Sequence, residues 1–180
     1  MSGLKGRVAV ITGAAGDIAS ATAKVLATEG VHLVLADLQE TPLAVLAKEL
    51  STRTRVVTIK QDVASQEDAE AVAAKCKEIF THVDFVITAA GLYEHLALPD
   101  ITPERWRRSM SVNLDGVFYT IQALRPLLAE GSAIVNITSV AGHRGSLDHT
   151  PYASAKGGVL TLTRSLAQEL GPRTRVNAVS

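Results

Sequence analysis

The sequence predicts an α/β protein built on a doubly wound parallel sheet. Short apolar runs rich in β-branched residues alternate with segments of helical periodicity along the chain. A turn of small residues, Gly13 to Gly16, directly follows the first run, and polar residues follow several of the later runs. Because the 180 residues contain no linker or internal repeat, we expect residues 1–180 to form a single domain.

The first strand and helix are expected on either side of the small-residue turn. Residues Arg7 to Thr12 read RVAVIT and predict a buried strand, and a helical pattern runs from Asp17 to Glu29. A strand, a glycine turn and a helix in this order leave unpaired backbone N–H groups at the start of the helix. Such a turn is suited to binding the pyrophosphate of a dinucleotide.

The second strand indicates which dinucleotide is bound. It covers Val31 to Ala36 and is followed by Asp37. A carboxylate at this position can accept hydrogen bonds from both ribose hydroxyls of NAD and repels the 2′-phosphate of NADP. We therefore expect NAD(H) to be preferred over NADP(H). The alternative is that Asp37 is an ordinary turn residue.

The middle of the chain continues the alternation. Arg53 to Lys60 predicts a third strand, and Asp62 and Val63 follow it. Ser65, with Asp68 three residues later, is typical of a helix N-terminus and predicts a helix to about Phe80. The next elements are a fourth strand over Val83 to Thr88, a long helix over Pro103 to Glu130, a fifth strand over Ala133 to Thr138, a helix over Thr150 to Leu170 and a sixth strand from Arg175 to Val179.

Two residues near the ends of the long helix support its predicted bounds. Pro103 suits the first helical position, where its missing N–H has no partner in any case. Gly131 is expected just past the end, and Pro126 is expected to kink the last turns.

The helix over Thr150 to Leu170 carries the strongest candidates for chemistry. Tyr152 and Lys156 are four residues apart, so they lie on one helix face. A lysine ammonium beside a phenol favours the ionised form, which allows tyrosine to exchange a proton near neutral pH. Ser139 and Asn113 precede this pair in the sequence. Without its spacing to Tyr152, Ser139 would be interpreted as the cap of a turn after the fifth strand.

Several motifs together resemble the short-chain dehydrogenase/reductase family. They are TGAAGDIA at 12–19, Asp62-Val63, Ala90-Gly91, NLDG at 113–116, Ser139, and the segment from Tyr152 to Lys156. The resemblance covers the whole chain and rests on the order and intervals of the motifs. It implies a Rossmann-type doubly wound parallel sheet with helices on both faces. Six strands are expected within these residues, without the final strand and the substrate lid with which the family continues.

The resemblance also implies roles for individual residues. Gly13 and Gly16 would let the backbone approach the cofactor diphosphate, Ile18 would lie beneath it, and Asp37 would bind the adenosine ribose. Asp62 and Val63 would meet the adenine, and Ala90, Gly91, Tyr152 and Lys156 would complete the cofactor site. Ser139 would bind the substrate oxygen, Tyr152 would exchange a proton with it, and Asn113 would position a water linking Lys156 to solvent. The implied reaction is hydride transfer between NAD(H) and a small alcohol or carbonyl compound.

Four residues depart from the family pattern. Asp17 and Ala19 stand where the family motif has its second and third glycines, and Thr88 and Ala89 replace its two asparagines after the fourth strand. An aspartate at a helix N-terminus competes with a pyrophosphate for the same positive field. We therefore expect cofactor affinity to be sensitive to Asp17.

Composition argues against several classes of function. The 18 basic and 18 acidic residues balance, so the charge predicts no binding to nucleic acid or an anionic membrane. The single Cys76 supports neither a disulfide framework nor a metal site, and no apolar run is long enough to span a membrane. We expect a cytoplasmic protein that, by resemblance, forms a homodimer or homotetramer through its two long helices.

Other functions remain open at this stage. A 3-oxoacyl-[acyl-carrier-protein] reductase is the main alternative substrate assignment, although Asp37 argues against NADPH. Asp17, Ala19 and Ala89 leave open a catalytically impaired NAD-binding or scaffold protein. A serine hydrolase would pair Ser139 with His143 or His149, but residues 137–141 do not form a nucleophile elbow. The loop residues that flank the expected substrate site are Tyr93, Glu94, His95, His143 and His149.

Overall fold

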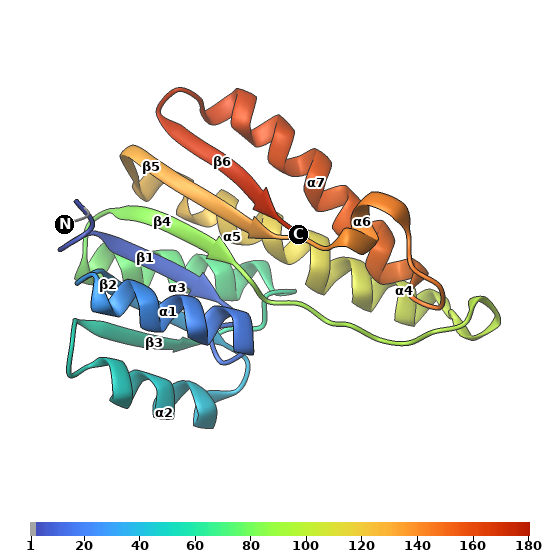
Figure 1. Ribbon diagram of the computed structural model, residues 1–180, viewed down its shortest axis with the longest axis horizontal. Coiled ribbons are helices and arrows are strands. Elements are labelled where there is room, and N and C mark those ends of the chain that lie inside the picture. The colour runs from blue at the N-terminus through green and yellow to red at the C-terminus, as the bar shows by residue number, and fades with distance from the viewer. Residues whose placement is uncertain (1–2) are drawn as a thin grey trace.

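A six-stranded parallel sheet forms the centre of the molecule (Figure 1). The computed structural model describes residues 3–180. The strand order is β3-β2-β1-β4-β5-β6. Strands β2 and β3 are added on one side of β1, and β4 to β6 are added on the other side, so the switch point lies between β1 and β4. Ligands of doubly wound sheets bind at the carboxyl ends of the strands beside such a switch point. The strands are β1 (Val8–Thr12), β2 (His32–Asp37), β3 (Val56–Lys60), β4 (Val83–Thr88), β5 (Leu128–Ile137) and β6 (Thr174–Val179).

Helices cover both faces of this sheet, as the sequence predicts. One apolar cluster joins β1 and β2 to α1 (Asp17–Thr28) and α2 (Glu40–Leu50). The other joins the sheet to α3 (Gln66–Ile79), α5 (Gly116–Leu124) and α7 (Thr150–Leu170). All five residues of β1 are buried, because a central parallel strand packs against helices on both sides.

Side-chain caps set the starts of two helices. The hydroxyl of Ser65 accepts the backbone N–H of Asp68 at 3.1 Å, which confirms the predicted start of α3. The Thr102 hydroxyl accepts the N–H of Arg105 at 3.3 Å, and Pro103 occupies the first position of α4 (Pro103–Met110). These contacts satisfy N–H groups that have no partner within the helix.

The predicted long helix to Glu130 is wrong. Helix α4 ends at Met110, a π-helical turn covers Ser111–Asp115, and α5 ends at Leu124. A 3-10 turn, Arg125–Leu127, then leads into β5. Pro126 has no N–H to donate and ends the helix instead of kinking it. Leu128 pairs with Val83 of β4, so β5 begins there and not at Ala133.

The third strand begins at Val56 and not at Arg53, and two other features also differ from the predicted elements. Gly131 lies inside β5 with φ of 75°, so it is not the residue after a helix. Short helices form at Leu98–Asp100 and at Val140–Arg144, the latter being α6. Segments this short have no periodicity that a sequence pattern can reveal.

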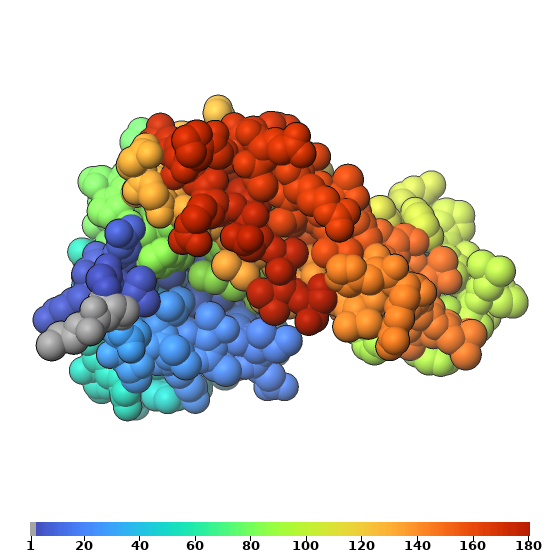
Figure 2. Space-filling model, turned by 45° about the horizontal axis from the view of Figure 1, so that its top comes forward, coloured from blue at the N-terminus to red at the C-terminus, as the bar shows by residue number. Residues whose placement is uncertain are grey.

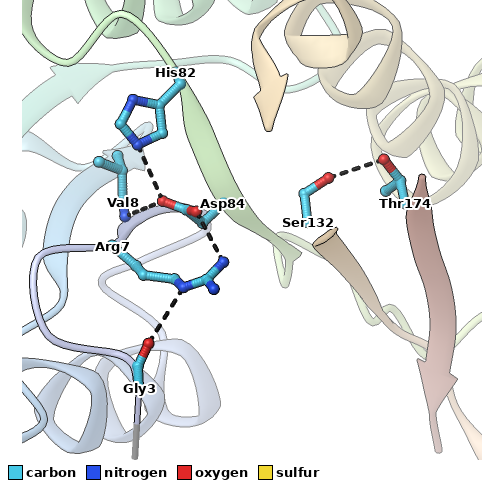
Figure 3. A network of polar contacts seen from close by, with 7 residues as sticks. All are labelled: Gly3, Arg7, Val8, His82, Asp84, Ser132 and Thr174. Atoms are coloured by element: carbon cyan, nitrogen blue, oxygen red, sulfur yellow. Dashed lines mark hydrogen bonds and ion pairs between the residues drawn. The ribbon is translucent and has the colours of Figure 1, made fainter. Parts of the chain in front are cut away.

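Polar contacts hold the strands together near their amino-terminal ends (Figure 3). The buried carboxylate of Asp84 accepts the N–H of Val8 at 2.8 Å and a guanidinium N–H of Arg7 at 3.1 Å. His82 Nε2 lies 3.4 Å from the same carboxylate. The hydroxyls of Ser132 and Thr174 lie 2.8 Å apart and join β5 to β6. These contacts lie away from the carboxyl ends of the strands, where the candidate site is located.

Within residues 3–180, no helix combines the length and apolar character needed to cross a bilayer.

Candidate active site

A cavity of about 480 Å³ opens at the carboxyl ends of β1 to β4. Seven of the predicted cofactor residues line it: Gly13, Gly16, Asp37, Asp62, Val63, Ala90 and Gly91. Ile18 does not line it and is 62% exposed on α1. Residues from four separate loops therefore converge at the switch point of the sheet, as expected for a nucleotide site.

Gly13 and Gly16 shape the turn between β1 and α1. Gly13 has φ of 63°, and a Cβ there would lie 2.5 Å from the Cα of Ala90. Only glycine fits at this position, because the β1 turn packs against the end of β4 and leaves no room for a side chain. Gly16 is the N-cap of α1 and provides no side-chain cap, so the first N–H groups of α1 depend on other partners. Asp17 is exposed in the first turn of that helix.

Asp37 connects two of the turns around the cavity. Its Oδ2 accepts the N–H of Ala15 at 2.9 Å, and its Oδ1 accepts the N–H of Gln39 at 2.8 Å. The turn role considered as an alternative is therefore present, and the same carboxylate also lines the cavity. Each carboxylate oxygen has a second lone pair for a ligand hydroxyl.

The Asp62-Val63 segment is fixed by α3 and α5. The N–H of Asp62 donates to Asp68 Oδ2 at 2.7 Å, and Asp62 Oδ1 accepts the N–H of Ala64 at 3.0 Å. A Cβ on Gly116 would lie 2.7 Å from the Val63 carbonyl oxygen. Glycine at the start of α5 thus lets the helix pack directly on the segment expected to meet adenine.

Tyr152 and Lys156 lie one turn apart on α7. The Lys156 ammonium lies 5.8 Å from the centre of the Tyr152 ring and donates to the Ile137 carbonyl oxygen at 2.9 Å. Lys156 is only 3% exposed, and this burial lowers its pKa to about 8, since desolvation disfavours the charged form. The structure thus places a buried cation beside the candidate acid/base.

Asn113 lies fully buried in the π-helical turn between α4 and α5. Its Oδ1 accepts the N–H of Leu92 at 3.0 Å, and its Nδ2 donates to the carbonyl oxygens of Leu92 and Ser109 at 2.9 and 3.0 Å. A Cβ on Gly91 would lie 3.2 Å from Asn113 Oδ1 and 3.8 Å from Lys156 Nζ. Asn113 and Lys156 therefore meet at the same loop after β4.

A second cavity, of about 410 Å³, contains Ser139 and Tyr152. Ser139 is the N-cap of α6, and its Oγ accepts the N–H of Ala141 at 3.1 Å, so the capping role also holds. The Tyr93 ring meets the Tyr152 ring edge-on, with ring centres 4.8 Å apart. The complete lining is Tyr93, Ser139, Val140, Ala141, Arg144, Gly145, Ser146 and Tyr152.

The loops that form this cavity lie side by side. The N–H of Leu96 donates to the Asp148 carbonyl oxygen at 2.6 Å, and Leu96 forms an isolated parallel bridge with His149. Figure 2 shows the orange surface around α6 beside the yellow-green surface of the segment that follows β4. Two segments far apart in the sequence thus border the candidate substrate site.

Of the five flanking loop residues, only Tyr93 lines either cavity within residues 3–180. His143 Nε2 lies 3.0 Å from the Ser180 hydroxyl, and His149 Nδ1 lies 2.6 Å from the Leu147 carbonyl oxygen. Within the described part of the chain neither histidine is hydrogen-bonded to Ser139, which argues against the serine hydrolase. Sequence reasoning missed Arg108 and Val112 in the first cavity and Arg144 in the second. These residues belong to no motif and reach the cavities only through tertiary packing.

The strand order, the glycine turn and the Tyr152/Lys156 pair define a Rossmann-type α/β oxidoreductase. Comparison with known proteins agrees with this class, since the family model for short chain dehydrogenase matches residues 7–180. The chain belongs to the short-chain dehydrogenase/reductase family.

Individual relatives cover nearly the whole chain. The crystal structure of a Brucella melitensis short-chain dehydrogenase/reductase, described as a glucose/ribitol dehydrogenase, is 40% identical with a TM-score of 0.96. The match covers 98% of this chain and 75% of that one. NAD⁺-bound xylitol dehydrogenase is 28% identical with a TM-score of 0.94, covering 99% and 71%. Trans-4-hydroxycyclohexanecarboxylate dehydrogenase of Sinomonas cyclohexanicum is 34% identical, covering 96% of this chain and 70% of its own.

Proposed function

We propose that this protein is an NAD-dependent oxidoreductase that interconverts an alcohol and the corresponding ketone, with Tyr152 as general acid/base. The observation that carries the proposal is the buried Lys156 ammonium, 5.8 Å from the Tyr152 ring centre. Tyr152 in turn shares a cavity with Ser139. A buried lysine costs stability, and a catalytic tyrosine gives a reason for its presence.

The lining of the first cavity supports binding of an adenine dinucleotide. The backbone at Gly13 lies too close to Ala90 for any side chain, which leaves bare peptide groups where a diphosphate would bind. Asp37 supports NAD over NADP, since its carboxylate would face a 2′-phosphate with like charge. Asp62 and Val63 would hold the adenine, and Lys156 would bind the nicotinamide ribose. Ile18, which is exposed on α1, would lie beneath the diphosphate.

Tyr152, Ser139 and the neighbouring Lys156 would have distinct tasks. In ketone reduction Tyr152 would donate its phenolic proton to the carbonyl oxygen, while the Ser139 hydroxyl would donate a hydrogen bond to the same atom. The Lys156 charge would stabilise the phenolate that remains on Tyr152. When bound, NADH supplies the hydride that the carbonyl carbon accepts. The reaction then consumes one ketone, one NADH and one proton and yields one alcohol and one NAD⁺.

Asn113 would act by positioning and not by chemistry. Its side chain holds Leu92 and Ser109, and so fixes the loop after β4 against the π-helical turn. Turns of this kind occur frequently at functional sites. We propose that Asn113 keeps open the proton path between Lys156 and solvent.

Replacing Tyr152 with phenylalanine tests the acid/base assignment. Turnover of a ketone panel with NADH should fall by at least about 100-fold, because a general acid typically contributes 10² to 10⁴ in rate. NADH affinity should stay within a few fold, since the ring is retained. The matched control is Tyr119→Phe on α5, which lies outside both cavities and should leave turnover unchanged. Retained turnover in Tyr152→Phe contradicts the assignment.

A further inference from the structure

Helix α6 fixes the backbone of Arg144 beside the second cavity. Ser139 caps its start, and it ends at Gly145, whose φ is 79°. Gly142 packs so closely on α7 that a Cβ there would lie 2.7 Å from the Lys156 carbonyl carbon. Helix α6 and the start of α7 therefore form one rigid unit, and Arg144 stands at the end of that unit.

Arg144 is the one side chain with a fixed charge among the residues that line this cavity in the described part of the chain. The other polar groups of the lining are hydroxyls, those of Tyr93, Ser139, Ser146 and Tyr152. No carboxylate lines the cavity within residues 3–180. A ligand with a negative charge would therefore meet attraction and no repulsion from the lining.

The acidic side chains near this cavity are engaged by other groups. Asp148 Oδ2 lies 3.4 Å from His95 Nε2, and Glu94 Oε1 lies 3.5 Å from Arg108. Across residues 3–180, no ion pair or hydrogen bond engages the Arg144 guanidinium. Its donors remain available to a ligand.

An aromatic side chain, Tyr93, also lines the cavity. Tyr93 stacks on His149 with ring centres 4.2 Å apart and planes 9° from parallel. The same Tyr93 ring meets the Tyr152 ring in a T-shaped arrangement, which holds it beside the reacting centre. Tyr93 is 62% exposed, so part of its ring remains accessible to an apolar ligand body.

We infer that the substrate is a cyclic oxo acid, or the corresponding hydroxy acid, whose carboxylate pairs with Arg144. Its carbonyl group would lie at Ser139 and Tyr152, and its ring would pack on Tyr93. The planar guanidinium fork binds a carboxylate through two parallel hydrogen bonds. This inference rests on the proposed function and assigns its substrate class.

The test compares two ketones of equal size, 4-oxocyclohexanecarboxylate and 4-oxocyclohexanecarboxamide, with NADH as hydride donor. Wild-type protein should reduce the acid with the higher kcat/KM. Arg144→Gln should lower kcat/KM for the acid about 10- to 100-fold, the range for loss of a charged hydrogen bond. It should leave the amide within about threefold, as for other exposed substitutions. Arg144→Lys should retain part of the preference, because it keeps the charge but loses the fork.

A matched control separates charge at the cavity from overall charge. Arg53→Gln makes the same change at an exposed arginine between α2 and β3 and should alter neither rate. Equal rates for both ketones in the wild type, or equal losses in Arg144→Gln, would overturn the inference while leaving the proposed function in place.

A binding measurement distinguishes failure of the proposed function from failure of the inference about the substrate. Calorimetric titration with cyclohexanecarboxylate and cyclohexanecarboxamide needs no turnover. The inference is supported if cyclohexanecarboxylate binds about tenfold more weakly to Arg144→Gln than to the wild type. This result supports it even if neither ketone is reduced and the proposed function is wrong. Equal binding of acid and amide, or binding that Arg144→Gln leaves unchanged, contradicts the inference.

Discussion

Replacing Lys156 with methionine should stabilise the protein while abolishing its activity. Methionine keeps the length and the apolar stem of lysine but removes the ammonium. Lys156 is 3% exposed, and its pKa falls from 10.5 to about 8 because burial disfavours the charge. Since one pKa unit corresponds to about 1.4 kcal/mol, the buried charge costs about 3 kcal/mol. Loss of the hydrogen bond from Lys156 to Ile137 destabilises the variant by about 1 kcal/mol. The free energy of unfolding of Lys156→Met should therefore exceed that of the wild type by about 2 kcal/mol at pH 7.

The stability difference between Lys156→Met and the wild type should decrease as the pH rises. The folded-state pKa lies below the unfolded value, so between pH 8 and 10.5 the unfolded wild-type chain binds more protons than the folded one. The wild-type free energy of unfolding therefore rises with pH in this window, by at most about 1.4 kcal/mol per unit. Below pH 8 both states are charged and the full penalty applies.

Urea unfolding of both proteins from pH 7 to 10.5 measures this difference. Burial raises the pKa of the Cys76 thiol to about 12, which lowers stability above pH 9. Both proteins contain Cys76, so its effect cancels in the comparison. The reasoning is refuted if Lys156→Met is less stable than wild type at pH 7, or if the gap between them does not change with pH.

Two further predictions concern the cofactor cavity. Asp37→Asn removes the charge and keeps one acceptor oxygen, so it retains one of the two turn contacts with Ala15 and Gln39. Affinity for NADPH relative to NADH should rise about tenfold. An unchanged ratio in fluorescence titrations would leave Asp37 as a turn residue only. Gly13→Ala places a Cβ 2.5 Å from the Ala90 Cα and should cost about 2 kcal/mol or more in urea unfolding. Gly131→Ala has a similar positive φ with no atom within 4 Å and should cost about 1 kcal/mol; equal losses would show that the Gly13 contact is unimportant.

The elements that the sequence specified best have strong local signals. The strand at Val83–Thr88 and the helix at Thr150–Leu170 have the predicted bounds, because one is a continuous apolar run and the other a long periodic segment. The cap at Ser65 was also correct, since a capping hydroxyl acts within three residues of itself.

The errors arose where tertiary contacts override local preference. The segment after Pro126 is apolar enough for a helix, but pairing of Leu128 with Val83 draws it into the sheet. The π-helical turn at Ser111–Asp115 depends on contacts of Asn113 with the loop after β4, which no local pattern encodes. Arg144 belongs to no motif, and only the packing of α6 on α7 brings it to the cavity of Tyr152.

Titration of the purified protein with NADH and NADPH, followed by nucleotide fluorescence, tests the central claim most directly. The proposed function requires a dinucleotide at the carboxyl ends of β1 to β4, in contact with Asp37. The account predicts saturable NADH binding, at least about tenfold tighter than NADPH, because the Asp37 carboxylate repels the 2′-phosphate. Binding of neither nucleotide, or equal binding of both, would contradict it.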